Sequence, residues 1–233
     1  IMAEPETEAQ FPGLGLALVQ AFVDSTGDDP RVRRYLALAL GRLESPPAET
    51  VAALSAALDD PDSETVISVI WALALLGEET VVPHIVGMFG AQDAGVRKMA
   101  VYALGVLPDD GSHTTLRAAL DDPVPDVQWN AAVSLARHGD GRGVTVLRRM
   151  LDRDYVTRQV TPSGTLADPV SDVMISGLQA VAALGAISLG ENLRVPVVAL
   201  ADADPSLKVR QAAMETLDAL EPSPIGRNVA ERQ

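Results

Sequence analysis

The strongest constraint on the fold of this chain is a short sequence pattern that recurs along most of its length. The tripeptide Asp-Asp-Pro occurs at 28–30, 59–61 and 121–123, and Asp204-Pro205 is a shorter version. The first two prolines are 31 residues apart and the next two are 62 apart, which is twice that distance. A period in this range is typical of proteins built from stacked repeats.

An amphipathic helical pattern follows each of these turns. Counting from a position zero, the residues at positions zero, seven and eleven are mostly apolar, and on a helix they lie within about 40° of one another. Position zero is occupied by Val32, Thr65, Val96, Val127, Val173 and Val209. A shorter apolar segment precedes each pattern, at 14–23, 51–58, 81–89, 115–120, 144–151 and 193–200. The sequence therefore predicts six pairs of helices, each with a short helix A and a longer helix B, stacked because one pair alone cannot bury its apolar face.

The residues between and after these helices fit the same interpretation. Aspartate is a good N-cap and proline fits the first helical position, so each Asp-Pro turn is expected to start a helix B. Glycine is common just past a helix end. The glycines that fall where helix B should end are Gly41, Gly77, Gly105, Gly139 and Gly185.

Three segments carry a resemblance to a known family. Residues 32–41 and 96–105 both read Val-Arg, five residues, Ala-Leu-Gly, and residues 204–210 read Asp-Pro, three residues, Val-Arg. These segments resemble HEAT-like repeats, and most of all the short type named after phycobilisome lyases. The resemblance implies an all-α, right-handed α-α superhelix (a solenoid) of six HEAT-like helix pairs, with helix B on the concave wall. It predicts one repeat domain at 11–220, between flexible tails at 1–10 and 221–233.

The resemblance also gives a role to the arginine after position zero, which in this family tends to pair with turn acids of neighbouring repeats. Here it is present as Arg33, Arg97 and Arg210 and replaced by Val66, Gln128 and Met174. We therefore expect the ladder of ion pairs to be interrupted in the second, fourth and fifth repeats.

The fifth repeat contains an insertion, roughly at 153–167, which is predicted to be a loop because it includes Thr-Pro-Ser-Gly-Thr. Its basic and aromatic residues are Arg153, Tyr155 and Arg158. Insertions in solenoids often lie on the binding face. A loop with no role is the open alternative, and in either case shortening it should cost little stability.

The candidate binding surface comes from positions two and six of helix B, which lie opposite the apolar stripe. Exposed aromatic side chains there would be typical anchors for a protein partner. We therefore expect Trp129 and Trp71 to face the groove, although packing between adjacent B helices is the alternative. The predicted partner-binding residues on the concave face are Leu38, Ile67, Trp71, Tyr102, Trp129, Val133 and Ile175.

Composition excludes several classes of function. The formal net charge of −14 disfavours nucleic-acid binding, and with it a HEAT-like DNA glycosylase. Because the chain has no cysteine, it has no disulfide, thiolate nucleophile or cysteine-based metal site. The longest uncharged stretch, 173–190, follows the repeat pattern rather than that of a membrane span. We expect a cytoplasmic protein of a GC-rich bacterial or archaeal genome, with an anchor upstream of Ile1 left open.

Enzyme signatures are also missing. His84, His113 and His138 fall in different repeats, without a second ligand at a metal-binding spacing. Residues 139–143 look like a phosphate loop, but no strand precedes them, so a turn between repeats is expected. The acidic turns are expected to cap helices rather than to bind a cation. We therefore predict no catalytic, cofactor or metal residues, and a scaffold or complex subunit that binds another protein. The alternative implied by the family name is a subunit of a chromophore (bilin or tetrapyrrole) lyase.

Overall fold

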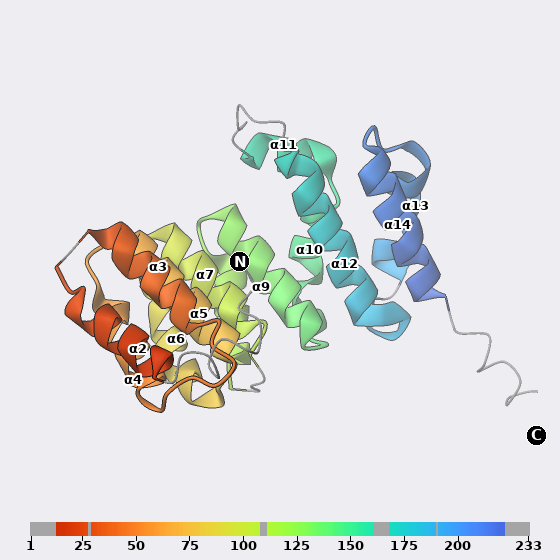
Figure 1. The fold of residues 1–233 in the computed structure, drawn as a ribbon. Coiled ribbons are helices and arrows are strands. Elements are labelled where there is room, and N and C mark those ends of the chain that lie inside the picture. Colours follow the sequence, from red (N-terminus) through yellow and green to blue (C-terminus); the bar gives the residue numbers. More distant parts are fainter. Residues whose placement is uncertain (1–12, 28, 108–110, 161–167, 190, 222–233) are drawn as a thin grey trace, which may run out of the picture. The chain divides into compact units, whose positions relative to one another are not determined.

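The structure, a computed structural model, describes residues 13–27, 29–107, 111–160, 168–189 and 191–221. These residues are almost entirely helices and turns, and no strand occurs among them (Figure 1). They belong to two compact units, residues 1–115 and residues 116–233. The predicted fold class, an all-α solenoid of helix pairs, is confirmed, whereas its right-handed superhelical twist and the single domain at 11–220 stay predictions.

The first unit contains three successive pairs of helices A and B. They are α2 (Leu14–Asp24) with α3 (Pro30–Leu40), α4 (Glu49–Ala56) and η1 (Ala57–Asp59) with α5 (Ser63–Leu76), and η2 (Glu79–Val81) and α6 (Val82–Met88) with α7 (Ala94–Leu104). The B helices α3, α5 and α7 pack side by side in that order. The predicted pairing is therefore confirmed in this unit.

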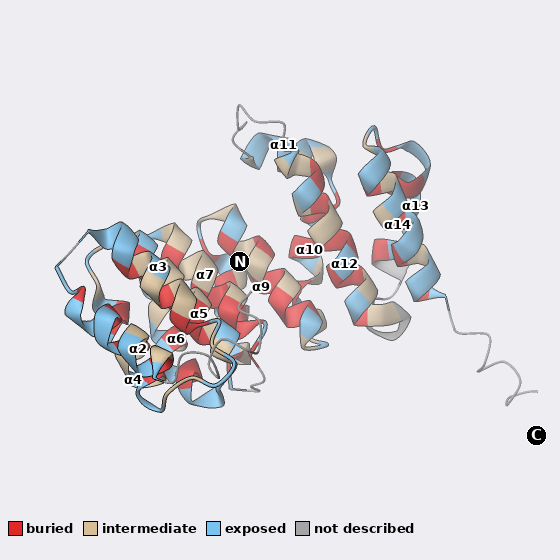
Figure 2. Cartoon of the chain, viewed as in Figure 1, coloured by how far each residue is buried: buried red, intermediate tan, exposed pale blue. Residues whose placement is uncertain are grey.

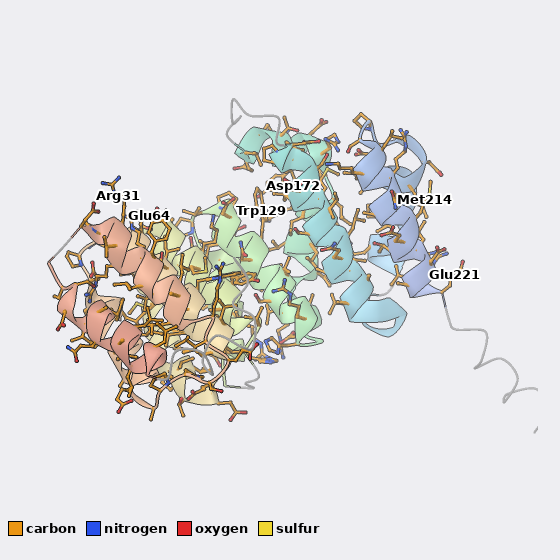
Figure 3. The ribbon with its side chains drawn as sticks, in the orientation of Figure 1. Arg31, Glu64, Trp129, Asp172, Met214 and Glu221 are labelled. Carbon is orange, nitrogen blue, oxygen red and sulfur yellow. The ribbon has the colours of Figure 1, made fainter. Side chains whose placement is uncertain are left out.

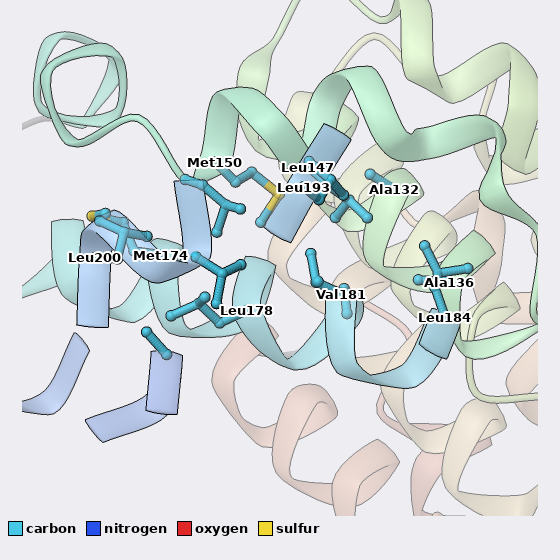
Figure 4. Close-up of a cluster of buried hydrophobic side chains, with 14 of the residues drawn as sticks. Ala132, Ala136, Leu147, Met150, Met174, Leu178, Val181, Leu184, Leu193 and Leu200 are labelled. Carbon is cyan, nitrogen blue, oxygen red and sulfur yellow. The ribbon is translucent and has the colours of Figure 1, made fainter. Parts of the chain in front are cut away.

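The second unit continues the same alternation. Its elements are α8 (His113–Ala118), which begins just before it, η3 (Ala119–Asp121), α9 (Pro125–Arg137), η4 (Gly141–Gly143), α10 (Val144–Met150), α11 (Arg153–Gln159), α12 (Pro169–Leu189), α13 (Glu191–Ala203) and α14 (Leu207–Leu220). The B helices α9, α12 and α14 pack in sequence. A core that includes Leu147, Met150, Met174, Leu178 and Val181 fills the space between the two helix layers (Figure 4).

Most of the predicted buried stripe is confirmed, because Thr65, Val96, Val127 and Val209 are all buried, while Val173 is half-buried. Figure 2 shows buried residues along the B helices. Val32 is an exception, since half of it is exposed. The side of α3 that carries Val32 is the side on which a preceding helix pair would pack, and α2 and α3 are the first pair described. The expectation that Val32 is buried was therefore wrong, although the helix that carries it was predicted correctly.

The Asp-Pro turns work differently from the prediction in three of four cases. Asp29 caps α3 and Pro30 begins that helix, as expected. In the other three turns, helix B begins three residues after the aspartate that precedes the proline, so the carboxylate of that aspartate caps no helix. Instead it accepts a hydrogen bond of 2.9 Å from the backbone N–H two residues later, as Asp60, Asp122 and Asp204 do. This is an Asx turn, and it orients the carboxylate for other partners.

Glycine closes several of the helices, as the sequence predicts. Gly41, Gly77 and Gly105 directly follow α3, α5 and α7. Gly77 adopts a left-handed conformation, with φ 69°, which the absence of a side chain makes possible without strain. At Gly41 there is no room for a side chain, since a Cβ there would lie 2.6 Å from the Cα of Ala72 on the neighbouring helix α5.

A methyl group at Gly41 is therefore expected to force α3 and α5 apart. We predict that Gly41→Ala lowers the free energy of unfolding by about 1–3 kcal/mol, measured by urea denaturation. Gly87→Ala is the matched control, because a Cβ at Gly87 would meet nothing within 4 Å and that residue lies inside α6. At that position alanine should raise the free energy of unfolding by about 0.5–1 kcal/mol, because alanine has a higher helix propensity than glycine. Equal effects of the two substitutions would contradict the close approach.

Candidate functional site

The predicted surface residues of the first unit lie together on its three B helices. Leu38 on α3, Ile67 and Trp71 on α5, and Tyr102 on α7 are all half-buried. The rings of Trp71 and Tyr102 stack across the two helices, with centroids 5.5 Å apart and planes inclined by 22°. The Cδ1 atom of Ile67 lies only 3.0 Å from where a Cβ would stand on Gly95 of α7. Ile67, Trp71 and Tyr102 are thus held by contacts between neighbouring helices and still reach solvent.

Polar contacts fix the same helices relative to one another. Arg34, at position two of α3, donates hydrogen bonds of 2.8–3.0 Å to both carboxylate oxygens of Asp62. Asp62 is also the N-cap of α5 and accepts the N–H and the hydroxyl of Thr65. The hydrogen bond from the Thr65 hydroxyl and those from Arg34 lower the pKa of Asp62, so this carboxylate remains ionised at neutral pH.

Two further apolar residues extend this surface and were missed by the sequence reasoning. Leu75 and Val106 stand four residues after Trp71 and Tyr102, and both are well exposed. Leu75 shares a helix face with Trp71, so the i, i+4 spacing could have found it, whereas Val106 lies in the turn after α7. We name this surface the first-unit row. It consists of Leu38, Ile67, Trp71, Leu75, Tyr102 and Val106.

The same positions in the second unit behave differently. Trp129 is only 4% exposed and belongs to the hydrophobic core of that unit (Figure 3). The expectation that it faces a groove is wrong, and the alternative of packing between helices applies. Val133 and Ile175 are half-buried against the same core. On α14 these positions are Gln211 and Glu215, which are exposed and hydrogen-bonded to each other.

The insertion is not a plain loop. Its first seven residues form α11, with Asp152 as the N-cap and Val156 fully buried. Arg153 donates hydrogen bonds of 2.9 and 2.7 Å to Asp204, the residue directly after α13, whose side chain is 1% exposed. Tyr155 packs on the core and Arg158 is exposed. The predicted loop was therefore wrong for residues 153–159, while 161–167 lie outside the described residues.

The arginines after position zero mainly hold turns in place. Arg33 forms an ion pair of 2.8 Å with Asp60 of the next repeat and stacks over the ring of Phe22, at 4.7 Å. Arg97 and Arg210 donate to backbone carbonyls of the turn before their own helix. Gln128 does the same, with a 2.7 Å bond to the carbonyl of Asp122. The glutamine therefore holds its own turn as Arg97 and Arg210 do, without the ion pair to a neighbouring repeat that Arg33 makes.

The glycine-rich segment 139–143 is a turn held together by hydrogen bonds to the carboxylate of Asp140. Asp140 accepts hydrogen bonds from the side chain of Arg117 and from the N–H and the side chain of Arg142. Its own negative charge therefore occupies the place that a phosphate would need. Burial raises the pKa of Asp140, but the bonds from Arg117 and Arg142 outweigh it and lower the pKa to about 2.

This pKa predicts a specific acid sensitivity. Because the folded-state pKa lies below the ordinary aspartate value of 3.8, the contribution of Asp140 to stability is complete above about pH 4 and is lost as the pH falls toward 2. We expect Asp140→Asn to lower stability by roughly 1–2 kcal/mol at pH 7. In urea titrations from pH 7 down to 2.5, the gap between wild type and variant should narrow below pH 4. A gap that stays constant would contradict this role of Asp140.

In the part of the chain that the structure describes, no helix is both long and apolar enough to cross a bilayer. Nor do three or more histidine or carboxylate side chains gather there in a way that could hold a metal ion.

Comparison with known proteins identifies a repeat family. The family model described as HEAT repeats matches residues 16–105 and 88–161. No curated protein matches the chain.

Among solved structures, an engineered protein is 18% identical and aligns over 87% of this chain and 96% of its own, with a TM-score of 0.50. Human deoxyhypusine hydroxylase in complex with glycerol is 17% identical, over 93% and 99% of the two chains, with a TM-score of 0.46. A designed armadillo repeat protein is also 17% identical, over 88% and 99%, with a TM-score of 0.47. At such low identity the likeness concerns the fold alone.

Proposed function

Because the chain belongs to the HEAT-repeat family, we propose that it is a non-catalytic scaffold or complex subunit that binds another protein through the first-unit row. The observation that carries this proposal is the continuity of the row. Five of its six apolar or aromatic side chains stand on three successive helices, and the sixth, Val106, lies in the turn just after α7. Each is half-buried or exposed. Contiguous apolar patches on a surface that is otherwise polar are typical of protein-binding sites.

The two aromatic side chains of the row are well suited to anchor a partner. Tryptophan and tyrosine are the residues most often found as anchors at interfaces. The Trp71–Tyr102 stack holds both rings before a partner arrives, so little side-chain entropy remains to be lost on binding. The net charge of −14 would favour encounters with a partner of positive charge.

Finer parts of the sequence prediction stay proposals. Val133 and Ile175 remain predicted contacts, as does a role for Tyr155 and Arg158 near the insertion. The phycobilisome-lyase type of repeat, and with it a chromophore-lyase subunit, is the second candidate. A lyase-type subunit would have to bind a tetrapyrrole, so the test below can distinguish it from a protein-binding scaffold.

The test compares proteins that co-purify with the tagged chain from its native host. The informative variants are Leu75→Ser and Tyr102→Ser in the row, and the matched control is Leu16→Ser on α2, where the leucine is also well exposed. Circular dichroism and a thermal melt show whether each variant is folded. We expect a stoichiometric partner on wild type and on the control, and a loss of about tenfold or more in affinity for the row variants.

Two outcomes would count against the proposal. A partner that binds the folded row variants as tightly as wild type would place its site elsewhere. Visible-range absorbance of the purified protein, or a rise in melting temperature with added tetrapyrrole but with no protein partner, would favour the lyase-type subunit instead.

A further inference from the structure

The first-unit row has about the length and the width of an α-helix. On α5, Ile67, Trp71 and Leu75 follow one another at four-residue spacing, so they span about 12 Å along that helix. Across α3, α5 and α7 the row covers two interhelical spacings of about 8–10 Å each, which is about 16–20 Å in all. A helix of about 12–14 residues is about 18–21 Å long and, with its side chains, about 10–12 Å in diameter. Such a helix, lying across the three B helices, would cover the row.

An extended segment fits the row less well. Neighbouring chains in a sheet lie about 4.7–4.9 Å apart, so one extended chain would cover less than half of the width of about 12 Å. Extended segments are also commonly held by backbone hydrogen bonds to a free sheet edge, and the described residues contain no sheet. The dimensions of the row therefore favour a helix.

Acidic side chains stand at the middle of both long edges of the row. Glu64 lies seven residues before Trp71, on the same face of α5, and is exposed (Figure 3). At the opposite edge, Glu78 follows directly after Gly77, three residues past Leu75, and is also exposed. A helix lying across α5 would thus have a negative charge on each side of it.

Basic side chains do not cancel these two charges. Arg34 is already paired with Asp62, at 2.8 Å. Lys98 lies on α7 and Arg42 just past α3, so both stand at the ends of the row and not beside its middle helix. Residues 13–107 carry twelve acidic side chains against six basic ones. The charge around the row therefore complements a basic partner.

We propose that the segment that occupies the first-unit row is a basic amphipathic helix of another protein. Its apolar side packs on the row, and lysine or arginine side chains on its two flanks lie near Glu64 and Glu78. This inference rests on the proposed function, and it adds the conformation and the charge of the partner's binding segment.

The test uses three fluorescently labelled peptides of about 18 residues, which is about 27 Å as a helix, each titrated with the full chain and followed by anisotropy. The first peptide has leucines at helical spacing and lysines on both flanks. The second has glutamates in place of the lysines. The third has the composition of the first, but its leucines alternate, so a helix cannot align them on one face. We expect the first peptide to bind at least about tenfold more tightly than either of the others.

Variants of the chain show where the first peptide binds. Leu75→Ser should weaken its binding by about tenfold or more. Glu64→Lys should weaken it by about three- to tenfold and should strengthen the binding of the second peptide, because the charge at that edge is then reversed. Glu49→Lys on α4 is the matched control, since Glu49 is exposed on a helix A and the net charge changes equally. It should leave both affinities close to those of wild type.

Three results would overturn the proposal. Equal binding of the first and third peptides would show that the row does not select a helix. Equal weakening by Glu49→Lys and Glu64→Lys would show that only the net charge attracts the peptide. If no peptide binds, the row is left to another occupant, such as a second copy or a segment of this chain. The co-purification test of the proposed function uses none of these peptides, so the failure of either can be told from the failure of the other.

Discussion

Replacing Trp129 by alanine is expected to lower the free energy of unfolding by about 3–5 kcal/mol, one of the two largest effects of any single substitution considered for this chain. The indole is 4% exposed and packs in the core of the second unit, so its removal leaves a cavity that the surrounding helices fill only in part. Denaturation in guanidinium chloride, followed by circular dichroism, measures the loss.

Two controls separate the core role from a general effect of losing an aromatic residue. Trp129→Phe should cost much less, because the indole Nε1 has no hydrogen-bond partner among the described residues and a phenyl ring fills most of the space. Trp71→Ala should also cost less, because Trp71 is only half-buried. A Trp129→Ala variant as stable as wild type would contradict the burial of this residue.

Replacing Asp204 by alanine is expected to cost about 3 kcal/mol. Its carboxylate is almost fully buried, accepts two hydrogen bonds from Arg153, and also accepts the N–H of Ser206. The hydrogen bond to Asp204 raises the pKa of Arg153 in the native chain. Arginine is protonated at neutral pH even without that bond, so in the variant the guanidinium keeps its charge and loses its buried partner. The variant also removes the ion pair between α11 and the turn after α13.

The matched control for this pair is Asp202→Ala. Asp202 lies two residues earlier in α13 and is exposed, so its loss should change stability by less than about 0.5 kcal/mol. The double variant Arg153→Ala with Asp204→Ala should be less destabilised than the sum of the two single variants, because the unpaired charge is removed as well. Strictly additive effects would show that the two side chains do not interact.

The helices were predictable because their signals are local and repeated. The stripe of apolar residues, the glycines past α3, α5 and α7, and the spacing of the Asp-Pro turns all follow from backbone geometry. The function of each aspartate was less predictable. Asp29 and Asp60 both precede a proline, but only the helix start three residues later turns Asp60 into a partner for Arg33. The Asp-Asp-Pro sequence alone does not show at which residue the following helix begins.

The candidate site was only partly predictable, because burial at positions two and six depends on the neighbouring helices. Ile67 and Trp129 both occupy position two, at the same angle on their helices. Ile67 lies across a glycine of α7 and remains half-buried, whereas the larger indole of Trp129 packs into the core. A sequence gives the angle but not the distance between helices. Similarly, α11 was missed because its anchor, Asp204, lies 51 residues from Arg153.

The most direct test of the proposed binding surface uses the fluorescence of the two tryptophans one at a time. The chain contains only Trp71 and Trp129, so Trp129→Phe leaves the residue in the row and Trp71→Phe leaves the residue in the core. The protein that co-purifies with wild type is titrated into each variant. The account predicts a saturable change in emission for the variant that retains Trp71 and no change for the one that retains Trp129. A change confined to Trp129 would contradict it.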